Sequence, residues 1–364
     1  MSSPHATSSR VGGYVRFVMA IFYFFAARAL SVRATQGIYT PEWASLAEQI
    51  IFIFLLIVGF SSMGFWFDKQ MHPITEQGLP RRRGWMREAG MGISLGWGMA
   101  LIPVLAMALI GGIATSFTWH WSNVGWFLVN LAFFAVAALA EEVAFRGYAF
   151  QRLVSGLGGL GASFVFAAFY AILVSMIPGA SRASVLSGVA ITFLLSAAYL
   201  RTRALWVGWG INFAWKATRA LVFGLSVAGV NSRSPIVQGD PMGPFWLTGG
   251  SYGLEASWLS FVVLLAALPV VFGATEDLNF LHNAPVFEPG GIAVDLDAAA
   301  RAQHEAAAVQ PAVPNAPALF RRQSRQRAAC PRIHSAPAPN PPEDSNRAGT
   351  GIAPRVHALR VVCP

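Results

Sequence analysis

The sequence predicts an all-α membrane protein, a polytopic bundle of about eight transmembrane helices. Three observations lead to this fold class. The chain is 55% hydrophobic and only 12% charged, its mean hydropathy is +0.50, and long apolar runs recur along it. A soluble domain carries about 25% charged residues, so the missing charge indicates that lipid is the solvent.

Each predicted helix corresponds to one apolar run, and about 20 such residues are needed to cross the hydrocarbon core. The runs lie at residues 16–32, 50–67, 90–113, 124–150, 161–177, 183–200, 205–224 and 257–272. Arg16 and Arg28 lie within or beside the first run, which has no clear small-residue cleavage site. These features favour a retained helix over a secretory signal peptide.

The composition divides the chain into three parts. Residues 1–13 are polar, and we expect a disordered cytoplasmic N-terminus there. Residues 14–272 form the transmembrane helical domain. Residues 273–364 are rich in Ala, Pro, Gln and Arg, which cannot bury a core, so we expect a disordered cytoplasmic tail. Both cysteines, Cys330 and Cys363, lie in this tail, and the core therefore has no disulfide framework or thiolate metal site.

The net charge of +9 reflects membrane topology, and its placement argues against nucleic acid as a partner. Five basic residues share the loop between the second and third runs. They are Lys69, Arg81, Arg82, Arg83 and Arg87. Arg152, Arg201 and Arg203 fall in loops an even number of spans away, whereas the long loop 225–256 carries only Arg233. Because basic residues mark the cytoplasmic side, both termini are expected inside, in the plasma (inner) membrane, with the bilayer as partner.

Two adjacent carboxylates and an arginine lie at membrane depth in the fourth run. Glu141, Glu142 and Arg146 are preceded by a nearly continuous apolar segment, and each charge there costs at least ~2.5 kcal/mol. Glu142 and Arg146 are four residues apart in the favourable acid-before-base order. Glu141 points about 100° away from that face. This spacing favours a structural ion pair beside a reactive acid.

Four polar side chains from three predicted helices lie at similar depth. From the basic end of its helix, Glu141 and Lys216 are each about 16 Å deep, Tyr170 about 14 Å and Asn212 about 10 Å. Each has a structural alternative: a tyrosine can pack, an asparagine can link helices for about 0.6 kcal/mol, and a lysine can snorkel. For Glu141 a functional role is the stronger interpretation, because a buried unpaired acid is costly. For Tyr170 packing is the stronger one.

The histidines do not indicate a metal site. None of the seven lies deep in a predicted span, and the sequence has no HExxH motif and no carboxylate–histidine cluster. We therefore predict no cofactor and no metal ligands in the bundle.

Three stretches resemble a known family, the CPBP intramembrane proteases, also called Abi or type II CAAX prenyl endopeptidases. Residues 141–147 (EEVAFRG) match its EExxxR motif, residues 195–206 resemble the lead-in to its last motif, and residues 247–257 resemble an outer-loop sequence of bacterial members. The similarity covers roughly residues 80–272. It implies hydrolysis of peptide bonds in a cytoplasm-facing cavity, without a covalent intermediate.

The resemblance also implies roles for individual residues. In the family, the first glutamate and a histidine from an FxxxH motif are thought to activate water, and an HxxxN motif is thought to stabilise the oxyanion. Glu141 is then the general base, and Glu142 with Arg146 is its scaffold, so these three are the predicted catalytic residues. The family is often described as metalloproteases, although no metal-ligand cluster is found in this sequence.

Three positions depart from the family pattern. Tyr170 stands where FxxxH has histidine, and Asn212 and Lys216 stand where HxxxN has histidine and asparagine. A tyrosine of ordinary pKa about 10 is a poor proton relay near neutrality. A lysine facing Glu141 would hold it in an ion pair and weaken it as a base. Since losing one acid–base partner typically costs about 10²–10⁴ in rate, we expect impaired proteolysis.

Three functions remain open at this stage. The first is an intramembrane endopeptidase homologue with impaired hydrolysis, acting on a membrane-bound or lipidated peptide. The second is a non-catalytic binding or immunity protein, in effect a pseudoprotease, that uses the former active-site cavity. The third is a transporter, because Glu–Lys pairs also line proton pathways, although no matched pair of broken helices suggests inverted repeats.

Overall fold

The structure is a computed structural model that describes residues 4–38, 40–230, 236–276 and 278. The expected C-terminal tail falls almost wholly outside these residues. The long helices are α1 (Pro4–Ala34), α2 (Pro41–Asp68), α4 (Trp85–Leu109), α5 (Val124–Arg146), α6 (Tyr148–Ser175), α7 (Arg182–Thr202), α8 (Trp206–Ala217) and α10 (Trp258–Ala274). The short elements are α3 (Pro73–Glu76), β1 (Ile113–Phe117), η1 (Trp121–Asn123), the π-helical turn η2 (Thr218–Val222), β2 (Val237–Pro241), α9 (Phe245–Thr248), η3 (Gly250–Tyr252) and η4 (Leu254–Ala256).

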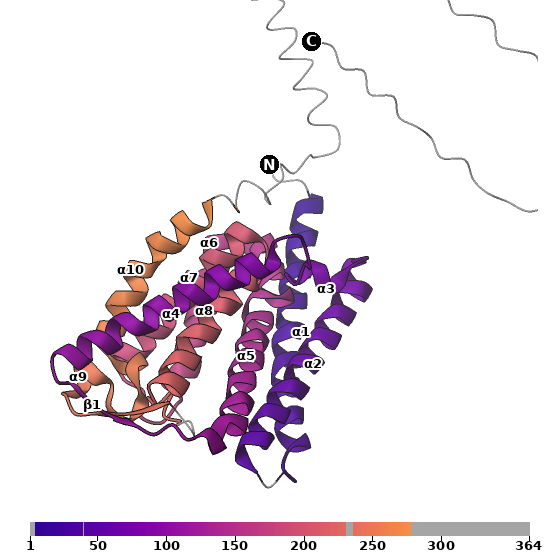
Figure 1. Ribbon diagram of the computed structural model, residues 1–364. Coiled ribbons are helices and arrows are strands. Elements are labelled where there is room, and N and C mark those ends of the chain that lie inside the picture. Colours follow the sequence, from indigo (N-terminus) through magenta and orange to yellow (C-terminus); the bar gives the residue numbers. More distant parts are fainter. Residues whose placement is uncertain (1–3, 39, 231–235, 277, 279–364) are drawn as a thin grey trace, which may run out of the picture. The chain divides into compact units, whose positions relative to one another are not determined.

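The described chain forms a helical bundle suited to a lipid environment. Helices α1, α2, α5 and α8 pack side by side in that order, and α4 packs against α8 (Figure 1). Large apolar side chains point outward: Phe22, Phe54, Phe164 and Val262 are 73%, 63%, 64% and 59% exposed. Such an apolar outer surface is stable only where hydrocarbon replaces water. The protein is an integral membrane protein.

By length and composition, five stretches of helix among the described residues are able to cross a membrane. They are Gly12–Ala34, Pro41–Asp68, Trp85–Leu109, Trp121–Ser175 and Arg182–Thr202. This number falls short of the expected eight, for two reasons. The 55-residue stretch contains both α5 and α6, and the apolar helices α8 and α10 are only 12 and 17 residues long.

The helix boundaries add detail to the predicted runs. Helix α1 begins at Pro4, and its stretch able to cross a membrane begins at Gly12, close to the predicted start of the transmembrane domain at residue 14. The apolar run 124–150 is divided between α5 and α6 at Gly147. Farther along α6, the glycine-rich stretch 156–161 forms a kink, with Gly158 at φ 75°. A positive φ of this kind favours glycine because it has no β-carbon.

Glycines set the close approach of α4 to α8, the helix that carries two of the candidate site residues. A β-carbon at Gly96 would meet backbone atoms of Ile211, and one at Gly210 would meet backbone atoms of Ala89 and Gly92. Such small residues allow the backbones of membrane helices to approach closely. Helix α8 is thereby held against α4 along most of its length.

A small sheet and a folded loop close one end of the bundle, opposite the N-terminus of α1 (Figure 1). Strands β1 and β2 pair antiparallel, with Ile113 opposite Pro241 and Phe117 opposite Val237. This sheet is an exception to the all-α expectation. The loop between η2 and α10 then forms α9, η3 and η4, and its described residues place Tyr252 and Glu255 at the edge of the bundle interior.

At the other end, one carboxylate joins three helices. Asp68, at the end of α2, accepts from Arg16 of α1 at 2.5 Å and from Arg152 of α6 at 2.6 Å. The hydroxyl of Tyr148 donates to its second oxygen at 2.7 Å. The side chain of Asp68 is only 7% exposed, so these three donors replace its hydration.

Candidate functional site

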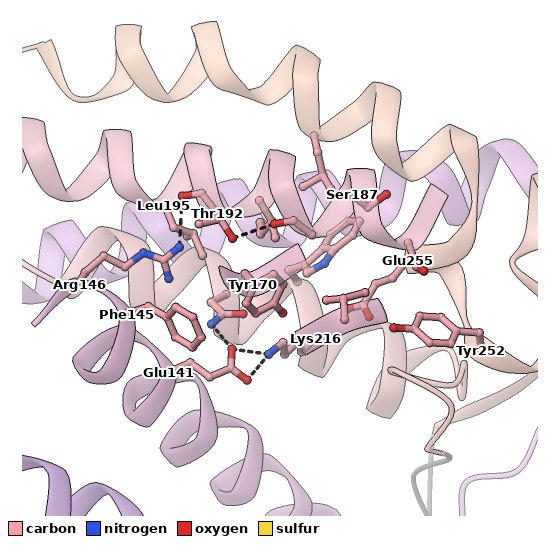
Figure 2. Close-up of a pocket in the computed structure, with 17 residues that line it drawn as sticks. Glu141, Phe145, Arg146, Tyr170, Ser187, Thr192, Leu195, Lys216, Tyr252 and Glu255 are labelled. Atoms are coloured by element: carbon pink, nitrogen blue, oxygen red, sulfur yellow. Dashed lines mark hydrogen bonds and ion pairs between the residues drawn. The ribbon is translucent and has the colours of Figure 1, made fainter. Parts of the chain in front are cut away.

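A carboxylate, an amide and an ammonium meet between α5 and α8. Lys216 Nζ lies 2.5 Å from each carboxylate oxygen of Glu141, and Asn212 Nδ2 donates to Glu141 Oε2 at 2.9 Å (Figure 2). Asn212 and Lys216 are four residues apart on α8 and share one helix face. Nearby, the indole N–H of Trp209 donates to the carbonyl of Ala135 at 2.8 Å and holds α8 against α5. The predicted similarity in depth thus becomes direct contact.

The ion pair lies between two hollows, and both Glu141 and Lys216 line each of them. The inner cavity is enclosed by α5, α6, α7, α8 and the folded loop, and its water-sized space is about 30 Å³, enough for one or two waters. The side hollow, about 440 Å³, lies between the start of α2, α5 and residues 227–230. Glu141 is 34% exposed and Lys216 14%. The carboxylate is therefore the better hydrated partner.

The second glutamate is buried and paired within its own helix. Glu142 Oε1 accepts from Arg146 Nη1 at 3.1 Å, and the two side chains are 0% and 5% exposed. Arg146 Nη2 also donates to the carbonyl of Thr192 on α7 at 3.2 Å. On the other side, a β-carbon at Gly208 of α8 would lie 2.7 Å from Glu142 Oε2. The pair therefore fixes α5 between α7 and α8 and sets the rotation that aims Glu141 at Lys216.

Tyr170, from α6, lines the same inner cavity as Glu141 (Figure 2). Its ring packs edge-on against Phe145, with centroids 5.4 Å apart. The tyrosine thus combines the packing role expected from sequence with a position facing the cavity. All six positions singled out in the sequence lie in one cluster, since Glu142 joins the cavity-lining Arg146.

The family comparison bears on the part of the chain that holds this cluster. Residues 123–218, about a quarter of the chain, match the family model described as type II CAAX prenyl endopeptidase Rce1-like. This match supports the predicted resemblance to the CPBP family over these residues. Comparison with curated proteins and with solved structures finds no match. The CPBP match contains every residue of the cluster and ends two residues after Lys216.

A third ion pair, between Arg219 and Glu255, lies just beyond the CPBP match and was not predicted from the sequence. Arg219 is 0% exposed, donates to Glu255 at 2.6 Å, and has its guanidinium carbon 4.2 Å from the ring centre of Trp215. Its Nε also donates to the carbonyl of Trp215 at 2.7 Å. A signal was present: Arg219 is a charge within an apolar run, and Glu255 lies in the loop sequence resembling the family. The contact between Arg219 and Glu255 could not be inferred from the sequence, because it depends on how the loop folds back onto the bundle.

The Arg219–Glu255 pair affects the pKa values of two groups in the folded loop. Burial raises the pKa of Glu255, but the charges of Arg219 and Lys216 outweigh it, so the pKa lies below its ordinary value. Burial, together with the charge of Glu255, raises the pKa of Tyr252 to about 12. Glu255 therefore presents an ionised carboxylate to the inner cavity near neutral pH.

The groups around Glu141 do not suit a metal ion. Both of its carboxylate oxygens accept from the Lys216 ammonium, which has no lone pair to offer a metal. In the part of the chain that the structure describes, no group of three or more His, Cys, Asp or Glu residues could hold a metal ion. We therefore derive no catalytic step through a metal.

Proposed function

We propose that this CPBP-family membrane protein is an intramembrane endopeptidase homologue whose peptide hydrolysis is impaired by an internal ion pair. The observation that supports this most strongly is the position of the Lys216 ammonium, 2.5 Å from both oxygens of Glu141. A general base must have a lone pair directed at the proton it removes. An ammonium so close to both oxygens would compete with a water for the lone pairs of the proposed base.

The surrounding groups retain part of a hydrolytic site. In the proposed mechanism Glu141 removes a proton from water, and the amide of Asn212 is placed to donate to an oxyanion once it is released from the carboxylate. Glu142 and Arg146 hold the helix in place. Tyr170 supplies a phenol where the family has an imidazole, and a phenol is a weak proton acceptor near neutral pH. Slow hydrolysis of a membrane-bound or lipidated peptide is the activity we expect.

The proposal includes a membrane topology. The eight proposed spans of the plasma (inner) membrane are the long helices, with α5 and α6 crossing separately and α8 extended by the π-helical turn η2, and both termini are cytoplasmic. The basic residues support this orientation, because Arg82, Arg152 and Arg203 all lie at the end of the bundle where α1 begins, as the positive-inside rule requires of a cytoplasmic end. The C-terminal tail is proposed to be a cytoplasmic extension.

A second function is favoured by the side hollow. At about 440 Å³ it falls in the size range of ligand sites, about 300–1,000 Å³, and its wall includes Phe133, Phe134 and Val227 beside the Glu141–Lys216 pair. A hollow that is apolar with a charged end can hold a lipidated peptide without cleaving it. Under this alternative the protein is a non-catalytic binding or immunity protein.

Reconstitution with candidate lipidated peptides separates the two functions. The variants are Glu141→Gln, which removes the base, and the triple change Tyr170→His, Asn212→His and Lys216→Asn, which restores the family residues. Impaired hydrolysis predicts slow cleavage that Glu141→Gln abolishes and the triple variant accelerates by about 10²-fold or more. Cleavage only by the triple variant supports the binding function. Cleavage that continues unchanged in Glu141→Gln contradicts a role for this residue as base.

A further inference from the structure

A second polar hollow lies at the basic end of the bundle, far along α6 from the inner cavity. Its volume is about 570 Å³, and it lies between the segment that follows α2, the first two turns of α6 and the end of α7. We call it the basic hollow. The residues that line it include Gln70, Arg82, Arg152, Ser155, Tyr199 and Arg203. Three arginines from three separate segments of the chain therefore share one concave surface.

Hydrogen bonds hold the walls of the basic hollow in place. Arg82 donates Nε and Nη2 to the two oxygens of Glu88, each at 2.9 Å, and Nη2 also reaches the carbonyl of Thr202 at 2.9 Å. Gln151 donates to the hydroxyl of Tyr199 at 2.6 Å and to the carbonyl of Glu76 at 2.5 Å. Helix α6, the loop and the end of α7 are thus joined before any ligand arrives. Such preorganisation lowers the entropic cost of binding.

The same loop is fastened to the start of α8. The backbone N–H of Leu205 donates to the carbonyl of Gly78 at 2.8 Å, and the indole N–H of Trp206 donates to the carbonyl of Pro80 at 2.9 Å. Gly78 has φ 97°, a conformation that lets the loop turn back toward α8. The loop that forms one wall of the basic hollow is therefore attached to the bundle through the start of α8.

The three arginines of the basic hollow differ in whether they already form an ion pair. Arg82 is paired with Glu88 and Arg152 with Asp68. The Arg152 side chain is nevertheless 20% exposed and lines the hollow. Arg203 is exposed, caps the end of α7 at φ 52°, and makes no ion pair within the described ranges. The hollow thus has one guanidinium without an ion pair among the described residues, Arg203, and a second that is partly accessible, Arg152.

The neighbouring surface of α6 is apolar. Leu157 and Leu160, shortly after Ser155, are 47% and 75% exposed. A ligand with a phosphate in the basic hollow could extend an acyl chain along this surface into the hydrocarbon region. Guanidinium groups match the oxygens of phosphate in geometry and charge, and basic pockets between membrane helices are known sites for anionic headgroups.

We propose that the basic hollow binds a phosphate group, with Arg203 as its main ligand and Arg152 as the second. The source is either the headgroup of an anionic lipid or a soluble phosphate, and the apolar α6 surface favours the lipid. This site is separate from the Glu141–Lys216 pair and does not depend on the proposed hydrolysis.

The test measures the thermal unfolding midpoint of the full-length protein in a neutral detergent while ligand is added. The probes are dioleoyl phosphatidylglycerol, dioleoyl phosphatidylcholine as the neutral lipid, and inorganic phosphate at constant ionic strength. A ligand that binds only the folded state stabilises it by RT ln(1 + [L]/Kd), so the midpoint rises with the logarithm of the ligand concentration once that concentration exceeds Kd. We expect phosphatidylglycerol to raise the midpoint in this way and phosphatidylcholine to leave it unchanged. A logarithmic rise with inorganic phosphate would instead assign the site to a soluble ligand.

Two variants and one control locate the effect. Arg203→Gln should weaken apparent phosphatidylglycerol binding about tenfold or more, because a hydrogen bond to a charged group contributes on that scale. Ser155→Glu keeps every arginine but places a carboxylate at the rim, and should weaken binding similarly. Arg83→Gln removes the same charge from an exposed residue outside the hollow and should bind as the wild type does. Equal binding by all four proteins, or an equal response to both lipids, would overturn the proposal.

Discussion

Replacing Glu141 and Lys216 singly and together measures how strongly the two side chains depend on each other. Glu141→Gln leaves an ammonium that is only 14% exposed without its counter-charge, a situation that costs about 3 kcal/mol in a buried pair. Lys216→Met leaves a carboxylate that is 34% exposed, faces the side hollow and keeps the bond from Asn212. We expect Lys216→Met to lower the free energy of unfolding by about 1–2 kcal/mol.

The double variant contains neither charge. A neutral pair of similar volume is often as stable as a buried ion pair. The double variant should therefore lose much less unfolding free energy than the two single variants lose together. We expect a coupling free energy of about 2 kcal/mol or more, measured by reversible unfolding in mixed micelles of neutral and denaturing detergent. If the free-energy changes of the two single variants add up to that of the double variant within about 0.5 kcal/mol, the side chains act independently. The ion pair could not then weaken Glu141 as a base.

Three further predictions concern other contacts in the bundle. Asp68→Asn should lower the unfolding free energy by about 3 kcal/mol in the same assay, because two arginines lose their shared carboxylate; a loss under about 0.5 kcal/mol would contradict this. Gly208→Ala should lower the free energy of unfolding by about 1–3 kcal/mol, since the new β-carbon would crowd Glu142, while the control Gly98→Ala, inside α4 with nothing within 4 Å of the new β-carbon, should raise it by about 0.4–1 kcal/mol. Because folding lowers the pKa of Glu255 from 4.5, its ionised form stabilises the fold above that value, and the contribution disappears as the pH falls through the folded-state pKa. Stability measured from pH 3 to 7 should therefore rise less steeply in Glu255→Gln than in the wild type, and identical slopes would refute the assignment.

The sequence predicted those parts of the site that depend on helical geometry alone. The rise per residue placed Glu141 and Lys216 at equal depth, and they are in contact. The four-residue spacing likewise predicted the bond between Glu142 and Arg146. In both cases the positions follow from regular helices, because each apolar run gives its helix a defined register in the bilayer.

Contacts made through loops could not be predicted in this way. Glu255 reaches Arg219 because the loop before α10 folds back into the bundle, and Asp68 joins three helices because α2 ends beside α1 and α6. Neither arrangement leaves a periodic pattern in the sequence. The number of spans was also harder to assign, since α8 has only 12 residues before the π-helical turn that contains Arg219.

The most direct test of the central claim uses the fact that the chain has only two lysines, Lys69 and Lys216. The protein is labelled with nitrogen-15 and carbon-13 lysine and carbon-13 glutamate in lipid nanodiscs, and the side-chain ammonium signals are followed by nuclear magnetic resonance. We predict that the Lys216 ammonium correlates with a glutamate carboxylate carbon and shifts in Glu141→Gln, while the exposed Lys69 stays unchanged. A Lys216 signal that resembles Lys69 and ignores the Glu141 change would contradict the account.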